Sequence, residues 1–463
     1  MEVRVTKIDI LSGYLSKFIL LGANFITLPV ILRMLSAEEV GMNYIMSSVG
    51  ALVQIADFGF SAQIGRNITY VISGAQRIYK KDIEESTKEN GLINFHLLAS
   101  VIESAKYVYK RISIGILFIL LTVGTLYMNH VTQGFSNVKN AFVIWITYSI
   151  GVFFNFYFLY YNSLLLGAGK IKEGNVAMVL SRIVYIGICF LLLFFNFGLL
   201  SIVTANIVAP FFSRGYAHYH FYSKEMKKNI ENENISISEI KNTINTIWYT
   251  ASRSGINMIG HFVGTQAGMF IAGFYLNLED AAKWGLMSQL YTVLAGVSMS
   301  MFMSQMPMFA KFNIQGKKDL LIRKSSQCIV VFWAFSIVGS IMINCVVPII
   351  LPIIGSKTSL PSSWILWFYC LYILITNNAQ IFACLLTCKN IIPSPKAVLA
   401  TAFITIILMF ICLHYFSMGI IGLIVSPFLA GITYTLWKWP QLVLRDFGLG
   451  YFAFLKRSFV FKG

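Results

Sequence analysis

The sequence is poor in charge, and this scarcity excludes an ordinary soluble domain. Only 12% of its 463 residues are Asp, Glu, Lys or Arg, whereas 57% are hydrophobic. A soluble domain carries about a quarter charged residues. The chain also lacks the segments of about ten alternating residues that are typical of membrane β-barrels. We therefore expect an all-α integral membrane protein.

Acidic residues are scarcer still, since 19 Asp and Glu stand against 36 Lys and Arg. The resulting net charge of +17 could indicate a nucleic-acid partner. The positive-inside rule is the better explanation, because a multi-pass membrane protein keeps its cations in cytoplasmic loops. We expect no nucleic-acid partner.

Cysteine and histidine are few, with seven and six residues. All seven cysteines fall in apolar runs, which favours buried thiols over disulfides or a metal site. GAGK at 167–170 lacks the earlier Gly and the following Ser or Thr of a phosphate-binding loop. The segments between apolar runs on the outer side are short and leave no room for a catalytic domain. We expect no enzyme activity, no metal and no cofactor.

What the sequence does contain is a series of long apolar runs. Each is long enough to cross roughly 30 Å of hydrocarbon as a helix. The first contains Lys17 and lacks the cleavage site of a signal peptide, so we expect it to be retained. The twelve predicted spans are 8–33, 39–74, 111–131, 140–167, 173–196, 198–222, 243–276, 280–310, 325–354, 361–388, 396–416 and 419–444.

The distribution of Lys and Arg predicts the orientation of these spans. Of the 36 cations, four lie in outer segments and four within spans, which leaves 28 on the other side. That bias places both termini in the cytoplasm. The four outer cations are Arg33, Lys139, Lys283 and Lys357.

The spans divide into two six-helix lobes, which we expect to surround a central cavity. The predicted parts are an N-terminal lobe (1–222), a polar cytoplasmic linker (223–242), a C-terminal lobe (243–445) and a cytoplasmic tail (446–463). Within the first lobe, apolar residues return at helical spacing over 92–109. This pattern predicts an amphipathic helix lying on the inner leaflet.

The two lobes carry a weak internal repeat. LSAEEVGMNYIMS (35–47) and LNLEDAAKWGLMS (276–288) match at one constant offset. Ser36 and Asn277 each fit the N-cap position of a helix, with acids following in the first turn. A parallel duplication of this kind is typical of a transporter with its site between the repeats.

Charged residues at membrane depth are costly and mark candidate functional sites. Lys17, Arg182 and Arg253 lie at about the same depth in three different spans, roughly 14 Å from the cytoplasmic end at 1.5 Å per residue. They predict a shared cationic cavity. The alternative is that each side chain extends to the inner headgroups.

Asp57 and Arg66 lie in DFGFSAQIGR (57–66), late in the second span. Their nine-residue separation does not suit a direct pair within one helix, which needs three or four. Asp57 is either an ion-coupling carboxylate or a salt-bridge partner or cap at a helix break. Arg66 is expected at the inner interface, as a contact for lipid headgroups or, with the other intramembrane cations, for a substrate.

Several of these motifs resemble the Wzx-type polysaccharide flippases of the multidrug/oligosaccharidyl-lipid/polysaccharide (MOP) exporter superfamily. The resemblance rests on Lys17 followed by ANFITLPVILRMLSAEEVGMNY, on DFGFSAQIGR, on NSLLLGAGKIKEGN (162–175), and on the 6 + 6 layout with a basic linker. It covers most of the chain, although the motifs of the second half are degenerate.

The resemblance implies alternating access and a cationic cavity for an undecaprenyl-diphosphate-linked oligosaccharide, moved from the cytoplasmic to the periplasmic or outer leaflet. It further implies the bacterial inner membrane, O-antigen or lipopolysaccharide synthesis, H⁺ or Na⁺ as candidate coupling ion, and a polysaccharide polymerase and chain-length proteins as candidate partners. Membrane lipids surround such a protein. A cation-coupled multidrug exporter of the same superfamily stays open as the alternative.

Overall fold

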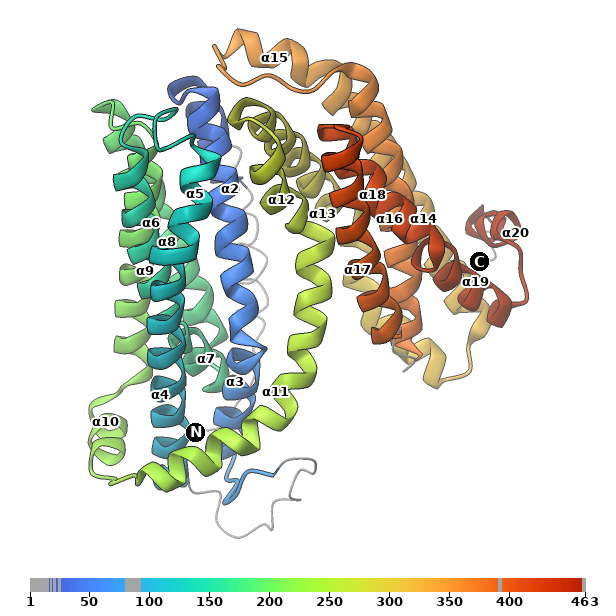
Figure 1. The fold of residues 1–463 in the computed structure, drawn as a ribbon. Helices are drawn as coiled ribbons and strands as arrows, with labels where there is room; N and C mark the ends of the chain where they lie inside the picture. The colour runs from blue at the N-terminus through green and yellow to red at the C-terminus, as the bar shows by residue number, and fades with distance from the viewer. Residues whose placement is uncertain are drawn as a thin grey trace. The chain divides into compact units, whose positions relative to one another are not determined.

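The structure is a computed structural model. It describes residues 26–79, 93–389 and 394–459, with residues 16, 19, 22 and 23 before them, and the backbone alone at 253, 254, 256, 257, 261 and 459. These ranges are helical and contain no strand. The chain forms two compact units, Met1–Ile259 and Gly260–Gly463 (Figure 1).

Length and composition identify the chain as a multi-pass membrane protein. Within the described residues, 8 helical runs are long and apolar enough to cross a membrane, and a bent pair, Ala37–Asp57 with Phe60–Ile72, makes up to 9. The eight are Phe95–Val131, Ala141–Gly167, Ile171–Phe194, Leu278–Ile314, Lys318–Ile353, Ser363–Cys388, Pro395–Tyr415 and Ile420–Phe447. The expected total of twelve spans stays a prediction.

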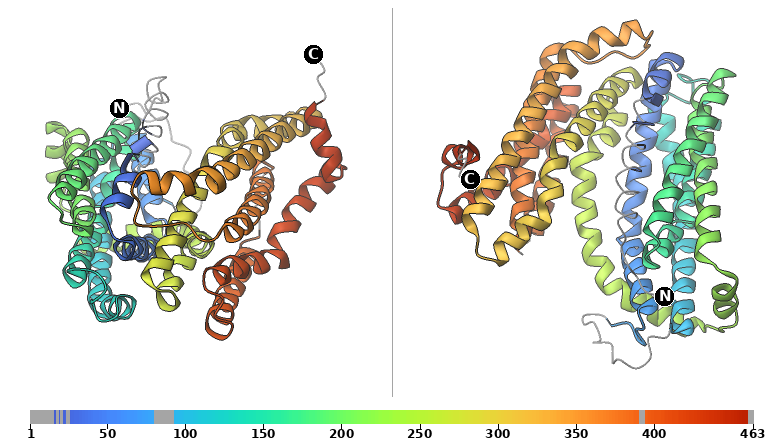
Figure 2. Two further views of the ribbon diagram at one scale, coloured as in Figure 1. Left: turned by 90° about the horizontal axis from the view of Figure 1, so that it is seen from above. Right: turned by 180° about the vertical axis from the view of Figure 1, so that it is seen from behind.

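The first unit is a bundle in which α8 packs on α9, α9 on α6, α6 on α4, and α3 on α7 (Figures 1 and 2). Its elements are α2 (Ala37–Gln54), the 3₁₀ turn η1 (Ile55–Asp57), α3 (Phe60–Ile72), α4 (Phe95–Ile119), the π turn η2 (Leu120–Gly124), α5 (Thr125–Val131), α6 (Ala141–Tyr157), α7 (Tyr160–Gly167), α8 (Ile171–Phe194), α9 (Leu199–Phe221), α10 (Lys224–Glu231) and α11 (Ile237–Thr265), whose residues up to Ile259 belong to this unit.

The second unit is built around α13, α14, α16 and α19. Its elements are α12 (Ala267–Tyr275), α13 (Leu278–Ile314), α14 (Lys318–Ile341), the π turn η3 (Met342–Val346), α15 (Val347–Ile353), α16 (Ser363–Cys388), α17 (Pro395–Phe410), the π turn η4 (Ile411–Tyr415), α18 (Ile420–Thr433), α19 (Thr435–Phe447), α20 (Tyr451–Lys456) and η5 (Arg457–Phe459). Phe454 of α20 is fully buried in the core with Phe332 and Phe382. The last described residues therefore pack on α14.

The expected amphipathic helix on the inner leaflet is wrong for the residues that the structure describes. Helix α4 runs without a break through η2 into α5, so that 95–131 form one run of 37 residues. Its apolar stripe, including Leu98, Ile102 and Tyr109, is buried where α4 meets α3 and α6. A helix packed on protein shows the same periodicity as one lying on lipid, so the pattern alone could not separate the two.

The expected helix caps are confirmed. Ser36 and Glu39 form a reciprocal capping box at the start of α2, and the Asn277 side chain accepts the Asp280 N–H (2.7 Å) at the start of α13. Glu39 Oε1 also accepts the Leu199 N–H (2.9 Å), the first residue of α9. One carboxylate thus satisfies backbone donors at the amino ends of two helices, where the dipole favours negative charge.

Two further features recur in both units and agree with the internal repeat. A π turn separates α4 from α5 in the first unit and α14 from α15 in the second. The residue before α9 is Gly198 (φ 58°, ψ −141°), and the residue before α18 is Gly419 (φ 56°, ψ −136°). At Gly198 a Cβ would lie 2.3 Å from Glu39 Oε1, so the cap itself requires glycine there.

Helices α3 and α7 approach each other closely along a line of small residues. Ser163 donates to the Ser61 carbonyl (2.8 Å), and Thr69 donates to the Gly167 carbonyl (2.9 Å). A Cβ on Gly167 would lie 2.6 Å from the Gly65 carbonyl oxygen. Small residues permit this backbone contact between apolar helices.

Gly167→Ala is therefore expected to push α3 and α7 apart and to lower the free energy of unfolding by about 1–3 kcal/mol. Gly174→Ala in α8 is the matched control, since its Cβ would meet nothing within 4 Å. Gly174→Ala should leave the free energy of unfolding unchanged or raise it by about 0.5–1 kcal/mol, because it removes a glycine from the interior of a helix. Thermal unfolding of the purified protein in detergent measures both, and equal melting temperatures would contradict the close-contact explanation.

Candidate functional site

The second predicted span is broken at Asp57. Phe58 (φ 46°) and Gly59 (φ 77°) both adopt the left-handed conformation, and the helices on either side are bent by 45°. Glycine takes this conformation at no steric cost, whereas phenylalanine rarely does. The surrounding contacts must hold Phe58 in place, which marks the break as a specified feature of the fold.

The Asp57 carboxylate holds this break together. It is buried, with 4% of the residue exposed. Oδ1 accepts the Tyr109 hydroxyl of α4 (2.5 Å) and the Ser61 N–H (3.2 Å), and Oδ2 accepts the Ser61 hydroxyl (2.8 Å). Of the alternatives raised by the sequence, the structure thus shows a cap at a helix break. The ion-coupling role stays a proposal.

The residues after Asp57 pack on the segment of α11 that carries Arg253. The rings of Phe58 and Phe60 lie 5.8 Å and 5.7 Å from that of Trp248. A Cβ on Gly255 would lie 2.0 Å from the Phe58 ring, so the ring sits directly against the α11 backbone. The structure describes only the backbone of Arg253.

The other expected site residues are less closely grouped. Arg66 lies exposed on α3, beyond the break. Arg182 is half-buried on α8, with its guanidinium carbon 4.7 Å from the centre of the Tyr185 ring. Lys17 lies outside the described residues. A shared cavity for Lys17, Arg182 and Arg253 therefore stays a prediction.

Arg214 is a half-buried cation that belongs to the 28 expected on the cytoplasmic side. It lies inside α9, and its Nη2 donates to both the carbonyl (3.0 Å) and the side-chain oxygen (2.8 Å) of Asn155 on α6. The Phe158 and Phe211 rings flank the guanidinium at 5.7 Å and 6.0 Å. Its position within the run 198–222 was the available signal, because a cation inside a span needs a polar partner.

Solved structures share this arrangement of helices. The chain is similar to the lipid II flippase MurJ in an inward closed conformation (TM-score 0.63, 15% identity, covering 98% of this chain and 90% of that one). It is also similar to an inward-facing multidrug resistance MATE family transporter of the MOP superfamily (TM-score 0.61, 13% identity, 91% and 95% covered). The chain therefore has the same fold as these two proteins.

The sequence profile of the polysaccharide biosynthesis protein family matches residues 9–313, about two thirds of the chain. The chain belongs to that family. The profile match thus shows the family, and the likeness to the solved structures shows the fold. No curated protein sequence matches it at a significant level.

Proposed function

We propose that the protein is a flippase that moves undecaprenyl-diphosphate-linked oligosaccharides from the cytoplasmic to the periplasmic or outer leaflet of the bacterial inner membrane. The observation that carries this proposal is the family match over residues 9–313 on a MOP-transporter fold. With both termini in the cytoplasm, alternating access carries the diphosphate and sugars through a polar interior. The polyprenyl tail stays in lipid, because an apolar chain in hydrocarbon carries no desolvation penalty.

In this proposal the intramembrane cations bind the diphosphate. Arg253 and Arg182 provide planar guanidinium groups suited to two-point phosphate contacts, and Lys17 provides a compact point charge. Arg66, exposed on α3 beyond the helix break, contacts the diphosphate at the inner mouth. Arg214 is not proposed as a ligand of the diphosphate, since its Nη2 already donates to Asn155.

Asp57 is the proposed coupling carboxylate, and its contacts suggest how coupling would work. The carboxylate accepts three hydrogen bonds that tie α3 to α2 and α4. A proton or a sodium ion would compete with Tyr109 and Ser61 for the same oxygens. Ion uptake would thus loosen the break, and ion release would restore it.

The alternative is a cation-coupled multidrug exporter, which is the class of one structural neighbour. Cationic drugs need intramembrane acids, whereas here Lys17, Arg66, Arg182 and Arg253 outnumber Asp57. An anionic substrate therefore fits the charge of the predicted interior better.

Reconstitution into proteoliposomes separates the two candidates. The expected result is that a fluorescent lipid-linked oligosaccharide becomes accessible to an impermeant quencher on the far leaflet only when the protein is present. A cationic dye offered in parallel should not accumulate. Dye transport without translocation of the lipid-linked oligosaccharide would reject the flippase in favour of the exporter.

A further inference from the structure

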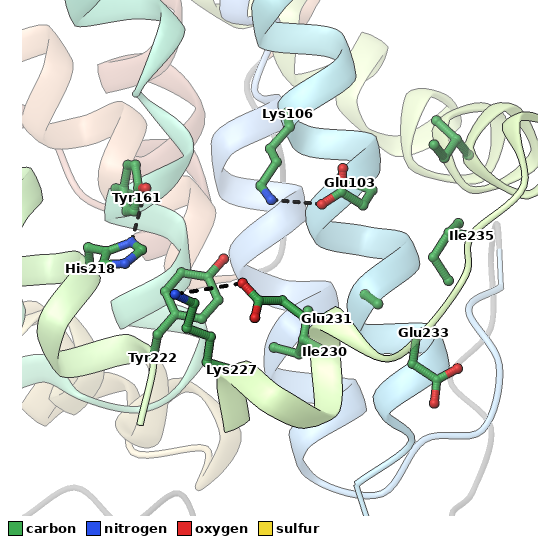
Figure 3. Close-up of a pocket in the computed structure, with 12 residues that line it drawn as sticks. Glu103, Lys106, Tyr161, His218, Tyr222, Lys227, Ile230, Glu231, Glu233 and Ile235 are labelled. Carbon is green, nitrogen blue, oxygen red and sulfur yellow. Dashed lines mark hydrogen bonds and ion pairs between the residues drawn. The ribbon is translucent and has the colours of Figure 1, made fainter. Parts of the chain in front are cut away.

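The first unit contains a cavity beneath α10, the short helix of the polar segment between the two halves of the chain. Its volume is about 420 Å³, within the roughly 300–1,000 Å³ of small-molecule sites. Figure 3 shows side chains from α4, α7, α9, α10 and the segment after α10 around this space. All of the lining residues lie between 99 and 240, so one unit builds the whole cavity.

Helix α10 is docked in a defined position. The Ser223 hydroxyl caps it by accepting the Met226 N–H (3.2 Å). Met226 and Ile230 are buried, with 9% and 7% exposed, and α10 contacts α4. The cavity therefore has a fixed wall on this side, although α10 belongs to a polar connecting segment.

The segment after α10 is also tied to α4. His96 Nδ1 lies 2.8 Å from Glu233 Oε2, and His96 Nε2 lies 3.1 Å from Glu239 Oε1. The backbone and hydroxyl of Ser236, followed by His96, lower the pKa of Glu239 to about 2. This carboxylate is thus ionised at any cytoplasmic pH, which keeps the connection in place.

The charged groups that line the cavity are largely paired with one another. Glu103 bonds Lys106 (2.7 Å), and Lys227 pairs with Glu231 (3.7 Å) (Figure 3). Each of these pairs uses one carboxylate oxygen. With Glu233 the lining holds three carboxylates and two ammonium groups, so a strongly charged ligand of either sign would face like charges.

Aromatic rings form another part of the lining. The Tyr161 hydroxyl lies 3.2 Å from His218 Nδ1, and the rings of His218 and Tyr222 are 4.8 Å apart. Figure 3 shows these three side chains on the side of the cavity facing Lys106 and Glu231. The lining thus combines flat apolar surface with hydrogen-bond donors and acceptors.

We propose that this cavity binds a neutral sugar of one or two rings. Sugar hydroxyls both donate and accept, so they suit the free carboxylate oxygens and the ammonium hydrogens together. The aromatic rings offer a surface for the apolar face of a sugar ring, and the paired charges make a neutral ligand preferable to an ion. A bound sugar touches α4, α9 and α10 at once, and so stabilises the docked position of the connecting segment.

The test is sugar binding to the full-length protein in lipid nanodiscs. Saturation-transfer NMR is recorded with the methyl glycosides of glucose, galactose and N-acetylglucosamine, and separately with inorganic phosphate and phosphoethanolamine. We expect saturable binding of at least one glycoside and none of the two charged probes. Phosphate or phosphoethanolamine binding without glycoside binding, or no binding at all, would overturn the proposal.

Matched variants on α10 locate the site. Glu231→Gln and Lys227→Gln change lining residues, whereas Glu225→Gln and Lys228→Gln change the same residue types on the same helix outside the lining. The first two variants should weaken glycoside binding about tenfold, the effect of losing one charged hydrogen bond. The second two should bind as the wild type does. Equal effects in both sets would show that the sugar binds elsewhere.

Whether the bound sugar comes from a lipid-linked oligosaccharide depends on the proposed flippase function, whereas sugar binding to the cavity does not depend on it. Displacement of the glycoside by a lipid-linked oligosaccharide that carries the same sugar identifies the transported substrate as the ligand. If the lipid-linked oligosaccharide does not displace the glycoside, the natural ligand of the cavity is a soluble sugar. Translocation in proteoliposomes without glycoside binding would reject this site alone, and glycoside binding without translocation would reject the flippase alone.

Discussion

Replacing Arg182 or Arg253 by alanine is expected to reduce translocation of a lipid-linked oligosaccharide about 10- to 100-fold. A hydrogen bond to a charged group contributes about 1.5–3 kcal/mol, and each of these guanidinium groups is proposed to contact the diphosphate. The measurement is the quenching assay in proteoliposomes, with the amount of reconstituted protein determined for each variant. Surface polysaccharide in cells should fall in parallel.

Arg33→Ala is the matched control, because Arg33 is exposed and lies in a predicted outer segment. It should translocate at the wild-type rate. Lysine at 182 or 253 should restore part of the activity, since it keeps the charge without the planar fork. Wild-type rates in both alanine variants would reject the cationic cavity.

Asp57→Asn is expected to remove the dependence of translocation on an imposed proton or sodium gradient. The amide keeps the shape of the side chain and one acceptor oxygen at the break, but it takes up neither a proton nor a cation. Asp57→Ala should instead lower the free energy of unfolding by about 3 kcal/mol, because the buried Tyr109 and Ser61 donors lose their acceptor. Transport with imposed gradients and thermal unfolding measure the two effects.

Two variants separate coupling from stability in this experiment. Tyr109→Phe removes one hydrogen bond to Asp57 and should cost about 1 kcal/mol while gradient dependence is retained. Asp319→Asn, in the exposed first turn of α14, should change neither property. If Asp57→Asn kept the wild-type response to the gradient, Asp57 would act only as the cap at the break.

The helix caps show which contacts can be predicted from neighbouring residues in the sequence. Ser36 and Asn277 could be identified as caps because the capping partner is three residues away along the chain. The second partner of Glu39 could not, since Leu199 is 160 residues distant. Likewise, nothing near Asp57 in the sequence indicated that Tyr109, 52 residues away, would donate to it.

The sequence by itself determined that the protein is helical and crosses a membrane repeatedly, because hydropathy over a single run decides whether that run can lie in hydrocarbon. It also determined the family, through the match over residues 9–313. Only the tertiary structure decided that Asp57 caps a break, that Arg214 pairs with Asn155, and that α10 closes a cavity against α4. The physical reason is that a buried charge takes its partner from whichever helix packs beside it, and hydropathy does not specify neighbours.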